Sequence, residues 1–165
     1  METGSEWRAS GGCACGGVRF RILARPLFVH CCHCSWCQRE TGSAFAVNAL
    51  IESDRVELLR GEVELVDTPS ASGKGQKIAR CPACHVAVWS HYAGAGAAIS
   101  FVRVGTLDLP HAIEPDIHIF TSTKRPWVLL PEGTPAVEAY YDARQYWPQE
   151  SQQRYLALKH SVGAT

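Results

Sequence analysis

The spacing of the cysteines is the feature that most constrains this chain. Its eight cysteines form three groups: Cys13-Ala14-Cys15, Cys31-Cys32-His33-Cys34-Ser35-Trp36-Cys37, and Cys81-Pro82-Ala83-Cys84. A CxxC turn directs two thiolates at one ion about 2.3 Å away. A CxC pair does the same where extended backbone puts residues i and i+2 on one face. The combination of these spacings indicates metal binding.

Two of the groups suit one closed zinc site. Cys13 and Cys15 would supply one half of a tetrahedron, and Cys81 and Cys84 the other half. Such a site joins the two halves of the chain. Its role would be structural, because zinc binding then contributes folding free energy, on the order of 10 kcal/mol in small zinc peptides.

The middle group predicts a different kind of site. Cys32, Cys34 and Cys37 form a CxCxxC motif. Adjacent strand residues point to opposite faces, so Cys31 is expected to be a small buried residue outside the site. Three protein ligands and an open position are typical of catalytic zinc. A three-ligand site loses its metal more easily than a closed one, so we expect partial occupancy here.

Two other interpretations of the cysteines remain open. A histidine could close the second site and make it structural, and the candidates are His30, His33, His85, His91 and His118. The cysteines could also form disulfides. However, residues 1–12 contain no apolar run typical of a signal peptide. We therefore expect a cytoplasmic protein with reduced thiols, in which clustered cysteines bind metal.

The net charge and the hydropathy of the chain limit the classes of partner that we expect it to bind. Sixteen basic and 16 acidic residues give a formal net charge of zero. The balance argues against a nucleic-acid partner, for which a basic surface would be needed. No stretch approaches the roughly 18 apolar residues that span a bilayer, so no membrane association is expected.

Short apolar runs predict a mainly β fold in one domain of 165 residues. The expected strands are 18–22, 27–34, 44–51, 56–59, 63–66, 76–80, 86–91, 98–104 and 117–120. The Arg60-Gly61 turn predicts a hairpin between 56–59 and 63–66. A helix is expected over 149–160. We assign residues 1–10 to a disordered segment, 11–135 to the zinc domain, and 136–165 to a C-terminal extension whose helix packs on the domain or trails it.

At these motifs the chain resembles the glutathione-dependent formaldehyde-activating enzyme family, which includes the centromere protein V relatives. The resemblance covers about residues 11 to 130. The matching stretches are Gly11–Phe20, Cys32–Arg39, Thr41–Phe45, Arg80–Cys84, Arg103–Asp108 and Pro115–Phe120, followed by Ser122, Lys124, Pro126 and Trp127.

The resemblance implies an Mss4-like fold, that of the small zinc proteins that bind Rab GTPases, in which a structural zinc clasps β-sheets. It implies that Cys13, Cys15, Cys81 and Cys84 hold the structural zinc. It also implies that Cys32, Cys34 and Cys37 hold a second, catalytic zinc. The implied activity is that of a carbon–sulfur lyase that adds glutathione to formaldehyde and gives S-hydroxymethylglutathione.

One position departs from the family pattern. His85 stands where the family usually has Gly after the second CxxC cysteine. A knuckle turn often needs a left-handed residue there, which His tolerates less well than Gly.

The expected chemistry needs a positive group near the second site. Zinc with three thiolates carries a net negative charge and favours a further thiol as fourth ligand. Four residues are candidates for the nearby cation or hydrogen-bond donor that contacts substrate: His33, Arg39, His118 and Lys124.

Other functions compete with the enzyme. The chain could be a non-catalytic zinc module that binds a protein partner, because fold does not determine function. A chromatin or microtubule binder would need a basic extension, and the net charge of zero with no basic tail argues against this function.

Overall fold

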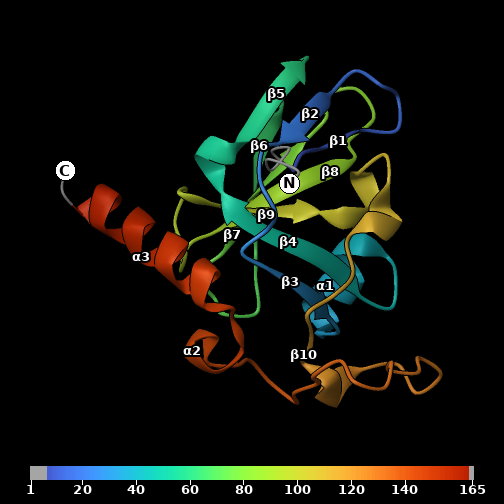
Figure 1. Cartoon of the computed structure of the whole chain (residues 1–165). Helices are drawn as coiled ribbons and strands as arrows, with labels where there is room; N and C mark the ends of the chain where they lie inside the picture. Colours follow the sequence, from blue (N-terminus) through green and yellow to red (C-terminus); the bar gives the residue numbers. More distant parts are fainter. Residues whose placement is uncertain (1–6, 164–165) are drawn as a thin grey trace.

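The computed structural model describes residues 7–163 (Figure 1). The strands are β1 (Ala9–Gly12), β2 (Arg19–Ile22), β3 (Phe28–Cys32), β4 (Ala46–Glu52), β5 (Val56–Arg60), β6 (Glu64–Thr68), β7 (Gln76–Arg80), β8 (Ala87–Tyr92), β9 (Ile99–Arg103) and β10 (Ile117–Ile119). The α-helices are α1 (Ser35–Thr41), α2 (Ala143–Tyr146) and α3 (Gln149–Gly163). The predicted mainly β fold with a C-terminal helix is confirmed.

The strands form two sheets within the described residues. The small sheet has the order β1-β2-β5, and the large sheet has the order β10-β3-β4-β9-β8-β7-β6. All neighbouring strands are antiparallel except β10 and β3, which are parallel. This one parallel pair brings the segment after residue 116 beside the strand that carries the middle cysteine group.

The expected hairpin between 56–59 and 63–66 is wrong. β5 pairs with β2 in the small sheet, whereas β6 pairs with β7 in the large sheet. The chain changes sheet at Gly61, whose φ is +73°. A Cβ atom at Gly61 would lie 2.2 Å from the Gly17 carbonyl oxygen, so this close crossing requires glycine.

Two elements were not expected from the sequence. Ala9 and Ser10 belong to β1, inside the segment assigned to a disordered tail; residues 1–6 of that segment lie outside the described residues. Helix α1 occupies the CxxC segment that was expected to form a turn. The Cys34 sulfur caps this helix by accepting a hydrogen bond from the Cys37 N–H at 3.3 Å, and Gly42 ends it in a left-handed conformation.

Both faces of the large sheet are covered around its central strands. One face contributes Ala49, Ile51 and Val102 to a core shared with Phe20 and Ile22 of the small sheet. The opposite face packs against the C-terminal extension through a second core; its buried members are Leu27, Phe28, Cys32, Leu50, Ile99, Phe101, Ile117, Ile119 and Trp147. Strand β3 lies between these cores, and all five of its residues are buried.

Helix α3 packs on the domain rather than trailing it. Tyr155 and Leu158 contact the second core. Arg154 binds the carboxylate of Glu52 at the end of β4 with two hydrogen bonds, of 2.9 and 2.6 Å. Glu52 is almost fully buried, so this ion pair fixes where the helix lies. No helix in residues 7–163 is long and apolar enough to cross a membrane.

We predict that Arg154→Ala destabilises the protein by about 2–3 kcal/mol, because it leaves the buried Glu52 carboxylate with only its weaker contact to Arg55. Urea unfolding would measure the loss. Arg144→Ala is the matched control: Arg144 pairs with Asp142 at the surface, and we expect a change within about 0.5 kcal/mol. Equal effects of the two variants would contradict the proposed docking of α3.

Candidate metal centres

The four-cysteine group lies where the two sheets meet. Cys13 and Cys15 occupy the turn between β1 and β2, and Cys81 and Cys84 occupy the turn between β7 and β8. Their four sulfur atoms lie within 4.8 Å of one another. The Cys13–Cys15 and Cys15–Cys81 separations are 3.5 and 3.7 Å. Sulfur ligands of tetrahedral zinc lie about 3.8 Å apart, so these residues fit a closed zinc site.

Backbone amides donate hydrogen bonds to two of these sulfurs, Cys13 and Cys84, and so favour their thiolate forms. The Val18 N–H donates to the Cys13 sulfur at 3.2 Å. Hydrogen bonds from the backbone amides of Val86 and Cys15 lower the pKa of Cys84 to about 6. Zinc binds the thiolate form, so these contacts favour the protonation state that the metal requires.

His85 completes the knuckle turn in a strained conformation. Its φ is +61°, in the left-handed region, and its N–H donates to the Cys81 carbonyl at 2.9 Å. The turn therefore does use a left-handed residue at this position. This conformation is about 1–2 kcal/mol less favourable for a residue other than glycine.

The second cysteine group lies at the end of β3. Cys32 is the last residue of the strand, Cys34 caps α1, and Cys37 lies in the first turn of the helix. The three sulfur atoms lie within 4.8 Å of one another, and no histidine or carboxylate of residues 7–163 joins the group. Three thiolates can hold zinc and leave a position for a fourth ligand.

The cysteine-bearing turn is held firmly in place. The buried side-chain amide of Gln38 donates to the His33 carbonyl at 2.7 Å and to the Thr123 carbonyl at 2.9 Å. The Thr123 hydroxyl also donates to the His33 carbonyl. These contacts join α1 to the segment that follows β10, so the three sulfurs do not depend on a flexible loop.

The three thiols differ sharply in acidity. Hydrogen bonds from the Cys32 and Cys37 thiols lower the pKa of Cys34 to about 2. The same contact with Cys34 raises the pKa of Cys32. The shared hydrogen bonds therefore favour a thiolate within the group, the form that binds zinc.

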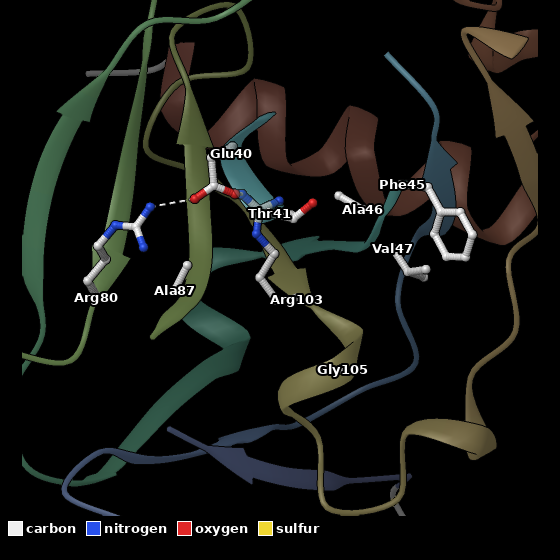
Figure 2. Close-up of a pocket in the computed structure, with 9 residues that line it drawn as sticks. All are labelled: Glu40, Thr41, Phe45, Ala46, Val47, Arg80, Ala87, Arg103 and Gly105. Atoms are coloured by element: carbon white, nitrogen blue, oxygen red, sulfur yellow. Dashed lines mark hydrogen bonds and ion pairs between the residues drawn. The ribbon is translucent and has the colours of Figure 1, made fainter. Parts of the chain in front are cut away.

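Beside this group lies a pocket of about 400 Å³ (Figure 2). Its lining residues are Glu40, Thr41, Phe45, Ala46, Val47, Arg80, Ala87, Arg103 and Gly105. Glu40 and Thr41 lie three and four residues after Cys37, on the same side of α1. Ala46 pairs with Cys32 across β3 and β4. No cysteine lines the pocket, but α1 and the β3–β4 pairing connect it to the three sulfurs.

Two arginines and one glutamate organise the pocket. The Glu40 carboxylate binds the Arg80 guanidinium through one oxygen and the Arg103 guanidinium, at 3.2 Å, through the other. Arg103 is buried and also donates to the Asn48 side chain. Figure 2 shows Glu40 between the two arginines. With two positive charges and one negative, the cluster keeps a net positive charge that suits an anionic ligand.

Sequence reasoning did not select Glu40, Arg80 or Arg103 as site residues. Each lies on a different element, α1, β7 or β9, and no local spacing links them. Arg80 and Arg103 belong to stretches that carry the family resemblance, but only the order of strands in the large sheet shows that they meet.

The expected substrate-contacting residues lie in three places. His33 and His118 are buried and contact Cys31, which belongs to a group separate from Cys32. Lys124 donates to the carbonyls of Arg125 and Val128. Arg39 is exposed on α1.

The remaining histidines do not approach the second site. His30 shares a strand face with Cys32, but its Nε2 makes a 2.5 Å hydrogen bond with the Tyr141 hydroxyl. His91 contacts the Ile99 carbonyl through Nδ1. All eight cysteines are free thiols, so the disulfide interpretation is not supported.

Comparison with known proteins adds a family and a structural likeness. The family described as glutathione-dependent formaldehyde-activating enzyme matches residues 8–123. The crystal structure of a Rhodobacter sphaeroides protein is 21% identical, covers 64% of this chain and 91% of its own, and gives a TM-score of 0.46. The curated protein sequences give no significant match.

We predict that His85→Gly stabilises the zinc-loaded protein by about 0.5–1 kcal/mol, because glycine removes the left-handed strain and partly offsets this gain by its greater freedom in the unfolded chain. Denaturant unfolding in the presence of zinc would measure it. Ala83→Gly, in the same turn and without a positive φ, is the control and should destabilise. A loss of stability in His85→Gly would show that the imidazole itself contributes to the knuckle.

Proposed function

Because the chain belongs to the glutathione-dependent formaldehyde-activating enzyme family, we propose that it is a zinc-dependent carbon–sulfur lyase. It adds a thiol, glutathione, to a small aldehyde, with formaldehyde as the first candidate. The observation that carries the proposal is the group of three thiols, which has no fourth ligand among residues 7–163 and lies next to a pocket of net positive charge.

Each metal centre has its own part in this proposal. Cys13, Cys15, Cys81 and Cys84 hold a structural zinc, and Cys32, Cys34 and Cys37 hold the catalytic one. Zinc at the second site lowers the pKa of a bound thiol and so supplies a thiolate nucleophile at neutral pH. The reducing cytoplasm, where we place the protein, keeps all of these cysteines available as ligands.

The reaction is an addition and needs no oxidant. The sulfur of the thiol forms a bond to the carbonyl carbon, the C=O double bond becomes a single bond, and the thiol proton ends on the oxygen. The task of the protein is therefore to hold the thiol and the aldehyde in contact and to favour the thiolate.

The pocket supplies the binding energy for the rest of glutathione. Its net positive charge, from Arg80 and Arg103 against Glu40, matches the carboxylates of the tripeptide. Phe45 and Val47 provide apolar surface on the other side of the pocket. Glu40 orients both guanidinium groups, so it acts as a positioning residue.

We predict opposite consequences for serine substitutions at the two metal centres. Cys34→Ser should reduce the formation of S-hydroxymethylglutathione, followed by NMR, to the rate of the uncatalysed reaction while circular dichroism shows a retained fold. Cys81→Ser should unfold the chain, because it opens the site that joins the two sheets. Unfolding of Cys34→Ser at the same temperature would contradict a catalytic role for the second site.

We also predict that Arg80→Gln raises the KM for glutathione about tenfold, the effect of losing one charge-assisted contact. The rate with 2-mercaptoethanol, which has no carboxylate, should not change. Arg60→Gln, at an exposed arginine of β5, is the control. An equal loss with both thiols would show that the substitution damages the metal centre instead of the pocket.

A second candidate function is a non-catalytic zinc module that binds a protein partner. The observation in its favour is the exposure of Trp127 and Leu129, whose side chains are 73% and 88% accessible. The Cys34→Ser experiment separates the two functions, since a purely structural second zinc predicts loss of fold.

A further inference from the structure

A third group of metal-ligating side chains lies inside the protein. Cys31, His33 and His118 are 2%, 0% and 6% exposed. One ligand atom from each lies within 4.8 Å of the others. The Cys31 sulfur is 3.6 Å from His33 Nε2, and His33 Nε2 is 3.0 Å from His118 Nδ1. The spacing argument, which set Cys31 aside as a small buried residue, did not identify this group.

Strand register brings the three residues together. Cys31 and His33 are two residues apart in extended backbone, so they share a face. His118 on β10 lies directly opposite Cys31 on β3 in the parallel pair, and the His33 N–H continues this ladder by donating to the Ile119 carbonyl at 3.0 Å. The side chain of Cys32 lies on the opposite face of the strand and belongs to the group with Cys34 and Cys37. The two groups are therefore distinct.

We propose that Cys31, His33 and His118 form a third metal site, which binds a divalent ion of the zinc type. Ligands of a tetrahedral zinc ion lie about 3.5 Å apart for a sulfur–nitrogen pair and about 3.4 Å apart for two nitrogens. The observed sulfur–nitrogen separation of 3.6 Å is close to the first value. The two nitrogens are 3.0 Å apart, so the imidazoles would move slightly apart when the ion binds. Ligands on paired strands also hold their geometry better than ligands on loops.

The two imidazoles also leave buried polar atoms without a protein partner. The outer nitrogens, His33 Nδ1 and His118 Nε2, are buried and have no partner. In a neutral pair, one inner nitrogen donates to the other. Whichever donates, one outer N–H and one outer lone pair remain buried and unpaired, which costs about 1–3 kcal/mol for each group.

A metal ion gives both inner nitrogens and the Cys31 sulfur a strong partner. Each outer nitrogen then carries a proton, which metal-bound histidines normally donate to a carboxylate, a carbonyl or water. No protein acceptor of residues 7–163 reaches these atoms, so the third site also requires an ordered water at each outer nitrogen.

The ligand atoms of the third site determine which metal ion it would prefer. One thiolate and two imidazoles suit zinc, whereas magnesium and calcium need oxygen ligands. One thiolate and a divalent ion leave a net positive charge, so the fourth position suits water or hydroxide. The site differs in this respect from the two cysteine-only groups.

Metal content tests the proposal. We expect Cys31→Ala, purified from zinc-supplemented medium, to hold about one zinc equivalent per chain less than the wild type by mass spectrometry of the metal. His118→Ala should lose the same amount. His91→Ala removes a histidine outside all three groups and is the control. Unchanged zinc content in a folded Cys31→Ala variant would overturn the third site.

A wild-type crystal provides a test that does not depend on a variant folding. An anomalous difference map at the zinc edge should contain a peak among Cys31, His33 and His118, separate from the peaks at the two cysteine groups. The electron density of the same crystal should contain ordered waters at His33 Nδ1 and His118 Nε2. A map with peaks at the cysteine-only groups and none between the histidines would overturn the proposal.

Discussion

The contact between the two sheets at the four-cysteine group is the constraint on which the rest of the structure depends. One CxC turn comes from the small sheet, and one CxxC turn comes from the large sheet. A tetrahedral zinc ion there would fix the two sheets at a single point with a free energy comparable to the stability of a whole domain. Zinc binding would offset the strained φ of His85, and the backbone amides at Cys84 favour the thiolate that zinc requires.

The four-cysteine group, the clasp between the two sheets, is connected to the second cysteine group through charged side chains. Arg80 directly precedes the clasp residue Cys81, and its guanidinium binds Glu40 on α1. Glu40 lies one helical turn after Cys37 and also binds Arg103 of β9. A change at the clasp would therefore move Arg80 and, through Glu40, the wall of the proposed glutathione pocket. The two cysteine groups are therefore linked through one carboxylate.

Local patterns predicted every described strand except β1, and they predicted the two sulfur groups that the structure brings together. Alternation along β2 and the opposite parity of Cys31 and Cys32 are properties of a single strand, so they can be read from sequence. Helix α1 was missed because seven residues are too few for a 3.6-residue period, and β1 because its glycines lower strand propensity. The Glu40 cluster and the Cys31 group were missed for another reason. Both depend on which strands are neighbours, and β10 reaches β3 only through a parallel pairing of distant segments.

The C-terminal extension explains why no histidine completes the second cysteine group. His30 lies two residues before Cys32 on the same strand face, which makes it the natural fourth ligand. However, the Tyr141 hydroxyl contacts His30 Nε2 and at the same time accepts a 2.7 Å hydrogen bond from the Trp147 indole. Burial also lowers the pKa of His30 to about 4, so the ring stays neutral. A neutral imidazole would bind zinc if it were free to turn. The extension, which lies beyond the residues that match the family, therefore keeps the proposed fourth position available for a thiol from outside.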